Sequence, residues 1–223
     1  MNARENRSSR KSLNKIAIVG CGPGHETYVT PAAVRAIERA GVLVGPKRLL
    51  DLFPSGRSER IALGSNIDEA LDMVAEKRHT HEVAILVSGD PGIFSLAKRV
   101  VDRFGRDSCE IVPGVSSIQV AFARIGLAWT DAKIISAHKE NPDARLWEST
   151  RDEDKIAILA GRATALQWIA SAASGLGNDR HMFVCEDLTL ETESIREVRA
   201  QDLADLDLSS RTIVLIIKKS VFE

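Results

Sequence analysis

The sequence has almost no net charge, because its 30 basic side chains nearly cancel its 31 acidic ones. A protein that binds nucleic acid usually carries a basic excess, so this balance disfavours nucleic acid as a partner. The sequence also lacks an apolar run near the roughly 20 residues that would span a bilayer, and we therefore expect no membrane partner. Apolar residues still make up 44% of the 223 positions and charged residues 27%, which is the balance of a soluble globular protein.

Cysteine and paired metal ligands are scarce as well. The three cysteines, Cys21, Cys109 and Cys185, stand far apart, and their odd number argues against a disulfide framework. No two of them have the spacing of a metal site, and no histidine pair has helical metal-binding spacing, so we predict no metal. Small apolar thiols of this kind fit a reducing compartment, and we expect a cytoplasmic protein.

The first 14 residues are basic and polar, with four cationic side chains against a single acidic one. No apolar segment follows these charges, so the stretch does not have the pattern of a secretory signal. Its composition predicts a disordered tail over residues 1–14. A basic arm that contacts a partner is the alternative.

The first half of the chain alternates short apolar runs with helical patterns. The run Val83–Val87 (VAILV) is apolar throughout, as expected at the centre of a parallel sheet. Thr30 and Pro31 are typical of a helix start, and Gly41 of a helix end. Strands joined by helices form βαβ units, which predicts a mostly parallel sheet with helices on both faces. The expected strands are residues 15–20, 42–45, 83–87 and 109–112, and the expected helices are residues 30–40, 66–77, 93–104 and 115–125.

The second half has more strands and fewer helices. Its last two expected strands follow each other without a long helix, which predicts a mixed, partly antiparallel sheet. The chain is therefore expected to be an α/β protein with an N-terminal domain over residues 15–126 and a C-terminal domain over residues 127–220. The expected strands of the second domain are residues 132–136, 155–159, 181–185, 194–198 and 212–218, and its one long helix is residues 163–173.

A glycine-rich loop, Gly20–Gly24 (GCGPG), follows the first strand. Its three glycines allow positive φ angles and a close approach of backbone to a ligand. The dinucleotide-binding fingerprint needs a third glycine where His25 stands, and an acid that is missing at the end of the second strand. Pro23 also lacks the amide that a phosphate site would use. A glycine-rich turn without a ligand remains an alternative.

Two further Gly/Pro segments, Ser88–Gly92 (SGDPG) and Val112–Ser117 (VPGVSS), also join a strand to a helix. Asp90 would lie at the carboxyl end of the central strand, where open parallel sheets bind ligands. It serves equally well as a turn residue that bonds its own backbone. A serine in the later segment can cap the following helix. Loops that follow parallel strands face the same edge, and this convergence favours a binding site.

Three segments, in this order and spacing, resemble motifs of the tetrapyrrole methylase family. GCGPGHETYVT at Gly20–Thr30 is similar to its glycine-rich N-terminal motif, SGDPGIFS at Ser88–Ser95 to its GDP motif, and VPGVSSIQ at Val112–Gln119 to its PGxSSxQ motif. Two later segments, ISAHKENP at Ile135–Pro142 and CEDLTLETESI at Cys185–Ile195, look most like the members that methylate C5 of precorrin-6Y or cobalt-precorrin-7.

The resemblance implies an S-adenosylmethionine-dependent methyltransferase of cobalamin synthesis, with the cofactor in a cleft between two domains. It also implies a homodimer. Some relatives carry a fused C15-methylating decarboxylase, and we expect that activity to belong to a separate partner here. Carried over by position, the cofactor contacts are Pro23, Gly24, Gly89, Asp90, Ile93, Ser117, Ile118, Ala160, Leu188 and Thr212.

Methyl transfer from a sulfonium needs alignment more than a protein nucleophile, because the donor is already activated. A base for the macrocycle proton is the one catalytic role we expect, and His138 is its candidate, with a structural histidine at a strand end as the alternative. The family usually has Gly-Arg after this histidine, whereas this chain has Lys139 and Glu140.

The corrin substrate would carry several carboxylates, which basic side chains could receive. Lys139, Arg124 and Arg162 are the candidates, and an ordinary solvated charge is the alternative for each. The tryptophans at 129, 147 and 168 could line a trough for the macrocycle, although Trp168 lies in the long helix and fits the core better.

Two competing functions remain open from the sequence. A family member could methylate another tetrapyrrole carbon, ribosomal RNA or a protein histidine derivative. The same fold could also serve as a non-catalytic subunit that binds a ligand or activates a partner. A cofactor-binding assay separates a methylase from an oxidoreductase, and a methyl-transfer assay separates an enzyme from a binding module.

Overall fold

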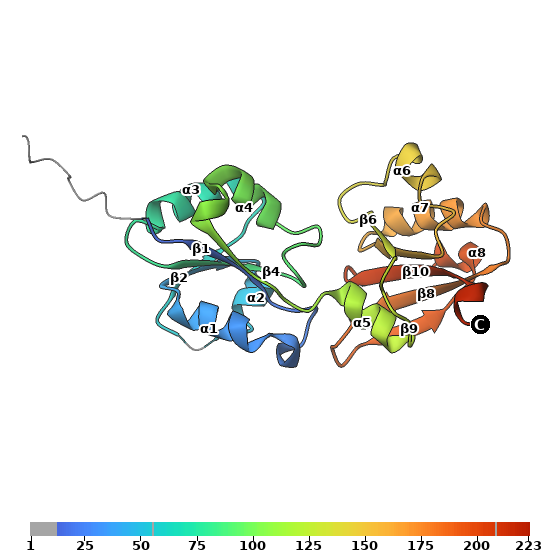
Figure 1. The fold of residues 1–223 in the computed structure, drawn as a ribbon, viewed down its shortest axis with the longest axis horizontal. Helices are drawn as coiled ribbons and strands as arrows, with labels where there is room; N and C mark the ends of the chain where they lie inside the picture. The colour runs from blue at the N-terminus through green and yellow to red at the C-terminus, as the bar shows by residue number, and fades with distance from the viewer. Residues whose placement is uncertain (1–12, 55, 208) are drawn as a thin grey trace, which may run out of the picture. The chain divides into compact units, whose positions relative to one another are not determined.

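The computed structural model describes residues 13–54, 56–207 and 209–223 (Figure 1). The expectation of a disordered tail therefore lies almost wholly outside the described residues. Contacts divide the chain into two compact units. The first comprises the described residues up to Cys21 together with Val29–Gly114, and the second comprises Gly22–Tyr28 and Val115–Glu223.

The first unit contains a five-stranded sheet in which every strand pair is parallel. Its central strand β4 is buried at every residue, because helices cover both faces of the sheet, as its unbroken apolar sequence predicts. The strands lie in the order β3 (Glu59–Ala62), β2 (Val42–Gly45), β4 (Val83–Val87), β1 (Ile16–Gly20) and β5 (Cys109–Val112).

Alternate side chains of this sheet pack against helices on opposite faces (Figure 1). Ile18 and Ile85 contact the core under α3 and α4, whereas Val19 and Leu86 contact the core under α1 and α2. Thr30 caps α1 as predicted, since its hydroxyl accepts a hydrogen bond from an amide in the first turn. The helices are α1 (Pro31–Arg39), α2 (Lys47–Leu50), α3 (Ile67–Lys77) and α4 (Ala97–Phe104), with a 3-10 turn at Arg106–Ser108.

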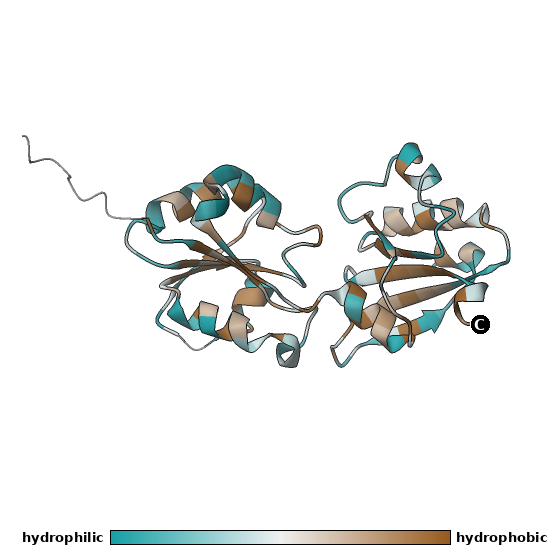
Figure 2. Ribbon diagram, in the orientation of Figure 1, coloured by the Kyte–Doolittle hydropathy of each residue, from teal (hydrophilic) through white to brown (hydrophobic). Residues whose placement is uncertain are grey.

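The second unit contains a mixed five-stranded sheet, as predicted. Strands β6 and β7 are parallel, whereas β10 is antiparallel to both of its neighbours and β9 is antiparallel to β8. The inner strands are the most apolar part of the unit (Figure 2). The strands lie in the order β6 (Lys133–Ser136), β7 (Lys155–Leu159), β10 (Thr212–Lys218), β8 (Arg180–Glu186) and β9 (Ser194–Glu197).

Helices also cover both faces of the second sheet. Side chains of α6, α7 and α8 pack on one face, and those of α5 pack on the other. No helix among the described residues is both long enough and apolar enough to cross a membrane. The helices are α5 (Ser117–Arg124), α6 (Ala144–Glu148), α7 (Ala163–Ser174) and α8 (Ala200–Leu203), with 3-10 turns at Glu26–Tyr28 and Lys219–Val221.

The contacts place the division between the units earlier than the expected boundary at residues 126–127. Helix α5 belongs to the second unit because its buried face packs on β10. The expected helix 93–104 also begins later, at Ala97. The Ser95 hydroxyl bonds the Pro91 carbonyl at 2.5 Å and the Ala97 amide at 3.0 Å, which holds the preceding residues in turns.

Candidate functional site

The three glycine-containing loops of the first unit follow three neighbouring parallel strands. Because β4, β1 and β5 are adjacent, Gly20, Gly89 and Gly114 lie at the same carboxyl edge. A Cβ atom added to Gly114 would lie 2.4 Å from the Gly89 carbonyl oxygen and 2.8 Å from the Gly20 carbonyl carbon. No side chain fits at such distances. The convergence predicted from the sequence is therefore present in the fold.

The Asp90 carboxylate holds two of these loops together. One oxygen accepts the Gly92 amide at 2.7 Å, which is the turn bond expected of an Asp-Pro-Gly sequence. The other oxygen accepts the Gly114 amide at 3.1 Å, from the loop after β5. The Ile93 amide bonds the Asp90 carbonyl at 3.2 Å. Asp90 thus acts as a turn residue and also as a clamp across the edge.

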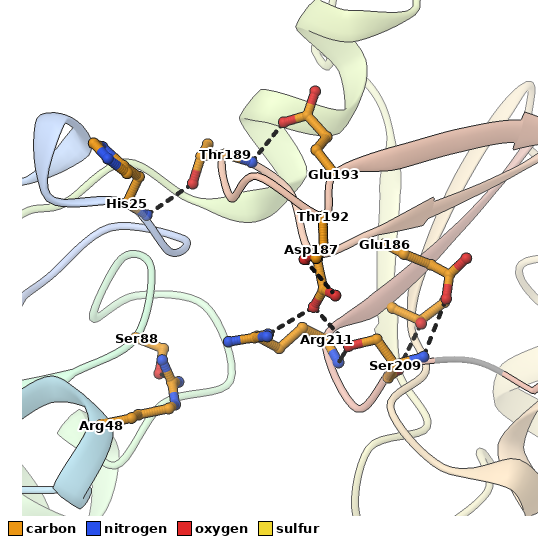
Figure 3. A network of polar contacts seen from close by, with 11 residues as sticks. His25, Arg48, Ser88, Glu186, Asp187, Thr189, Thr192, Glu193, Ser209 and Arg211 are labelled. Carbon is orange, nitrogen blue, oxygen red and sulfur yellow. Dashed lines mark hydrogen bonds and ion pairs between the residues drawn. The ribbon is translucent and has the colours of Figure 1, made fainter.

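The loop after β1 leaves the first unit and packs within the second. Gly22 has a φ of 75°, which turns the chain there. A Cβ atom on Gly24 would lie 3.0 Å from the Leu188 carbonyl oxygen, so this glycine allows close backbone contact. The His25 amide donates to the Thr189 hydroxyl at 3.0 Å (Figure 3). The predicted contacts Pro23 and Gly24 are in this way brought beside the predicted contact Leu188.

One edge of the second sheet collects the other predicted contacts of this unit. Since β8 and β7 are both antiparallel to β10, the ends of β6, β7 and β8 meet the start of β10. The Ala160 amide donates to the Thr212 carbonyl at 2.9 Å. Ala160, Leu188 and Thr212 are 1%, 3% and 3% exposed, so all three are buried at this edge.

Ser117 and Ile118 begin helix α5, and the residue before them caps it. The Ser116 hydroxyl accepts the Ile118 amide at 3.1 Å, and the Gln119 side chain accepts the Ser116 amide at 2.8 Å. This capping box confirms the expectation that a serine caps the helix. Ile118 is fully buried in the core under α5.

His138 lies just beyond β6, is exposed, and packs on the next strand end. A Cβ atom added to Gly161 would lie 2.6 Å from the His138 Nδ1 atom. Gly161 has a φ of 67° and follows Ala160 directly. The imidazole is therefore exposed at the edge that carries the predicted cofactor contacts, where a base could act. The base role itself stays a prediction.

The cationic candidates differ in how far their charges are already engaged. Arg124 forms a 2.6 Å ion pair with Glu193 and donates to the Tyr28 hydroxyl at 3.3 Å. The Arg124 hydrogen bond holds the pKa of Glu193 below its ordinary value, against the opposing effect of burial. Arg162 donates to the Ala137 carbonyl and to Asn141, both at 3.0 Å. Lys139 is exposed and directly follows His138, just beyond β6.

The tryptophans do not form the expected trough. Trp147 is 9% exposed, and Trp168 meets it edge to face at 5.5 Å within the core under α7. The core assignment of Trp168 is confirmed, and the trough prediction was wrong for Trp147, because α6 and α7 pack these rings together. Trp129 is 46% exposed.

The loop after β8 contains functional candidates that sequence reasoning missed. Asp187 and Thr189, on either side of Leu188, have left-handed φ angles of 46° and 72°. Such angles are costly for residues other than glycine and need support from tertiary contacts. The Asp187 carboxylate supplies it by accepting Ser209 Oγ at 2.6 Å, Arg211 Nε at 2.8 Å and Thr192 Oγ1 at 3.1 Å (Figure 3).

Burial raises the pKa of Asp187, but these hydrogen bonds outweigh it and hold the pKa below its ordinary value. The carboxylate is thus ionised at neutral pH and fixes the loop around Leu188. The only sequence signal was the cluster of polar residues in CEDLTLETE.

Another missed residue is Arg48, at the start of α2, which donates to the Ser88 hydroxyl in the second loop of the first unit (Figure 3).

Burial raises the pKa of the Cys21 thiol in this unit to about 12, despite the opposing effects of a hydrogen bond from Val87 and of the Arg48 charge. Cys21 is therefore a packed thiol and not a nucleophile at neutral pH. The described part of the chain contains no cluster of three or more potential metal ligands.

Comparison with known proteins gives a consistent set of relatives. The family model described as Tetrapyrrole (Corrin/Porphyrin) Methylases matches residues 15–204. The cobalt-precorrin-7 C(5)-methyltransferase of Salmonella typhimurium is 33% identical over 182 residues, which cover 81% of this chain and 88% of that protein.

Two solved structures have a similar fold. The cobalamin-biosynthesis precorrin-6Y methylase of Archaeoglobus fulgidus is 29% identical, with a TM-score of 0.70 over 92% of this chain and 98% of that one. The uroporphyrin-III C-methyltransferase of Thermus thermophilus, solved with S-adenosylhomocysteine, has a TM-score of 0.75 over 92% of this chain and 97% of that one. It is 21% identical, so this second likeness concerns the fold alone.

Proposed function

We propose, since the chain belongs to the tetrapyrrole (corrin/porphyrin) methylases, that it transfers a methyl group from S-adenosylmethionine to C5 of a corrin precursor. The proposed substrate is cobalt-precorrin-7 or its metal-free counterpart precorrin-6Y. The observation that carries the proposal is the 33% identity, over most of both chains, to a relative named for that reaction. The glycine-lined edge of the first sheet supports the cofactor part of the proposal.

The glycine-lined edge of the first sheet supports the proposal of a nucleoside cofactor. A Cβ atom on Gly20 or Gly114 would lie within 2.8 Å of backbone atoms of the neighbouring loops, which leaves peptide groups rather than side chains at these positions. Asp90 uses one acceptor position on each oxygen for backbone amides, and a carboxylate oxygen can accept a second hydrogen bond, such as one from a ribose hydroxyl. We assign cofactor binding to Pro23, Gly24, Gly89, Asp90, Ile93, Ser117, Ile118, Ala160, Leu188 and Thr212.

The chain's own residues would mainly orient the reactants. S-adenosylmethionine supplies an activated methyl group when bound, so an in-line approach of the nucleophilic carbon is the main requirement. This is consistent with buried thiols at Cys21 and Cys185, neither of which is a nucleophile. We assign to the exposed imidazole of His138 the removal of the macrocycle proton after transfer.

We assign the substrate carboxylates first to Lys139, which is exposed beside His138. Arg162 lies on the adjacent strand end, but hydrogen bonds to Ala137 and Asn141 already orient its guanidinium. Arg124 is a weaker candidate because Glu193 already neutralises its charge.

Three free cysteines support a reducing cytoplasm as the site of action. A homodimer and a separate C15-methylating decarboxylase complete the proposal.

The test begins with calorimetric titration of S-adenosylhomocysteine, with NAD as the control ligand. Saturable binding of S-adenosylhomocysteine alone is the expected result. The second step supplies S-adenosylmethionine carrying a ¹³C-methyl group with cobalt-containing and metal-free corrin precursors, and locates the new methyl by NMR. A new methyl group on a carbon other than C5, or on RNA, would overturn the proposed substrate. Binding of S-adenosylhomocysteine without any methyl transfer would favour a non-catalytic subunit.

A further inference from the structure

Phe94 combines two unusual features for a large apolar residue. It is 63% exposed, more than any other exposed large apolar side chain among the described residues. It also has a left-handed φ of 45°. A bulky residue pays a backbone cost at such an angle and gains little from an exposed ring. Neither feature stabilises the folded chain, so the side chain needs another explanation.

The backbone around Phe94 is held in place. The Ile93 amide bonds the Asp90 carbonyl at 3.2 Å, and the Ser95 hydroxyl bonds the Pro91 carbonyl at 2.5 Å and the Ala97 amide at 3.0 Å. These bonds hold the residues directly before and after Phe94 and connect the loop to the start of α4. The exposure of the ring is therefore a property of a well-connected turn and not of a loose loop.

The location of Phe94 indicates the kind of partner it meets. It follows Ile93, one of the proposed cofactor contacts, in the loop after the central strand, where parallel sheets bind ligands. The nearby cations of α4 are already paired, Lys98 with Asp102 at 2.5 Å and Arg99 with Asp68 at 2.8 Å. The exposed ring of Phe94 is thus an apolar aromatic group in this loop, and the cations that follow it on α4 are already paired.

We propose that Phe94 is a substrate-binding residue whose ring packs against the flat face of the tetrapyrrole macrocycle. The inference rests on the proposed function, because the macrocycle is the flat, conjugated partner that the function supplies. Aromatic rings gain from offset stacking in addition to area burial. Removal of the ring should therefore weaken the binding of the macrocycle and leave the cofactor site intact.

The test compares Phe94→Ala, Phe94→Leu and Phe94→Tyr with the wild-type protein. We expect the alanine and leucine variants to raise KM for the corrin substrate about tenfold, which corresponds to the loss of one stacked ring. The tyrosine variant should restore KM because it keeps a flat ring. The Kd of S-adenosylhomocysteine should stay within about twofold of wild type in every variant. Phe222→Ala, which removes another exposed phenyl ring, is the matched control and should leave KM unchanged.

Phe94→Gly separates a binding role from a structural one. Glycine accepts a left-handed φ without strain, so this variant should unfold at the same or a higher urea concentration while still showing the raised KM. The inference would be overturned if Phe94→Ala kept the wild-type KM. It would also be overturned if the substitution changed the oligomeric state of the protein and left KM unchanged. A wild-type protein that neither binds S-adenosylhomocysteine nor methylates a corrin would instead overturn the proposed function, and this inference with it.

Discussion

Gly114→Ala is the substitution for which the structure predicts the sharpest effect. The added methyl group would lie 2.4 Å from the Gly89 carbonyl oxygen and 2.8 Å from the Gly20 carbonyl carbon and oxygen. All of these are backbone atoms, so no side chain can rotate away to make room. The loops after β1, β4 and β5 would have to separate by several tenths of an ångström or more. The same movement would stretch the hydrogen bond from the Gly114 amide to Asp90.

The cost can be estimated from two contributions. Overpacking by one methyl group typically destabilises a protein by about 1–3 kcal/mol. Leaving the Gly114 amide or the Asp90 carboxylate poorly paired adds about 1–3 kcal/mol. We therefore expect Gly114→Ala to lower the free energy of unfolding by about 2–6 kcal/mol. Gly64→Ala is the matched control, since no atom lies within 4 Å of its added Cβ and its φ is not left-handed. It should be neutral or stabilising by about 0.4–1 kcal/mol.

The assay is urea unfolding of both variants, followed by titration of the folded fraction with S-adenosylhomocysteine. We expect a lower midpoint and weaker binding for Gly114→Ala alone. Equal midpoints for the two variants would show that the three loops do not depend on their close backbone contact. A destabilised Gly114→Ala protein with unchanged affinity would remove this edge from the cofactor site.

Two further predictions follow from charged and thiol groups. Because the folded-state pKa of Asp187 lies below its ordinary value of 3.8, its contribution to stability is present above that pH and is lost as the pH falls through the lower folded value. Urea midpoints measured from about pH 6 down to 3 should fall less steeply for Asp187→Asn than for wild type, and equal slopes would contradict the Asp187 network. Burial raises the thiol pKa values of Cys21 and Cys185 to about 12, so a thiol reagent at neutral pH should label them only after unfolding. Fast labelling of either in native protein, located by peptide mass spectrometry, would refute this.

Local patterns predicted most of the fold because apolar periodicity reports burial directly. Strand β4 is buried at every residue and was evident as VAILV. Strand β3 was missed because only Ile61 of its four residues is buried, which leaves no alternation to read. The short helices α2, α6 and α8 were missed as well, since four or five residues hold too little of a 3.6-residue pattern.

The candidate site was predictable where it depends on glycine and not where it depends on distant contacts. The crowding of Gly20, Gly89 and Gly114 follows from three motifs after three parallel strands. The left-handed backbone at Asp187 depends on bonds to Ser209 and Arg211, which are 22 and 24 residues away. No local pattern encodes such bonds, and this is why Leu188 was predicted from the sequence whereas the roles of Asp187 and Thr189 emerged only from the structure.

The membership of Gly22–Tyr28 in the second unit has a consequence for how the chain is made. The His25 amide meets the Thr189 hydroxyl across 164 positions of sequence. At ribosomal rates of about 5–20 residues per second, this loop waits roughly 8–30 seconds for its partner. The sheet that precedes and follows it can form in the meantime, but the loop cannot reach its final contacts until β8 has emerged. The second unit is therefore not finished in the order in which it is synthesised, and the first motif of the chain is among the last to reach its native contacts.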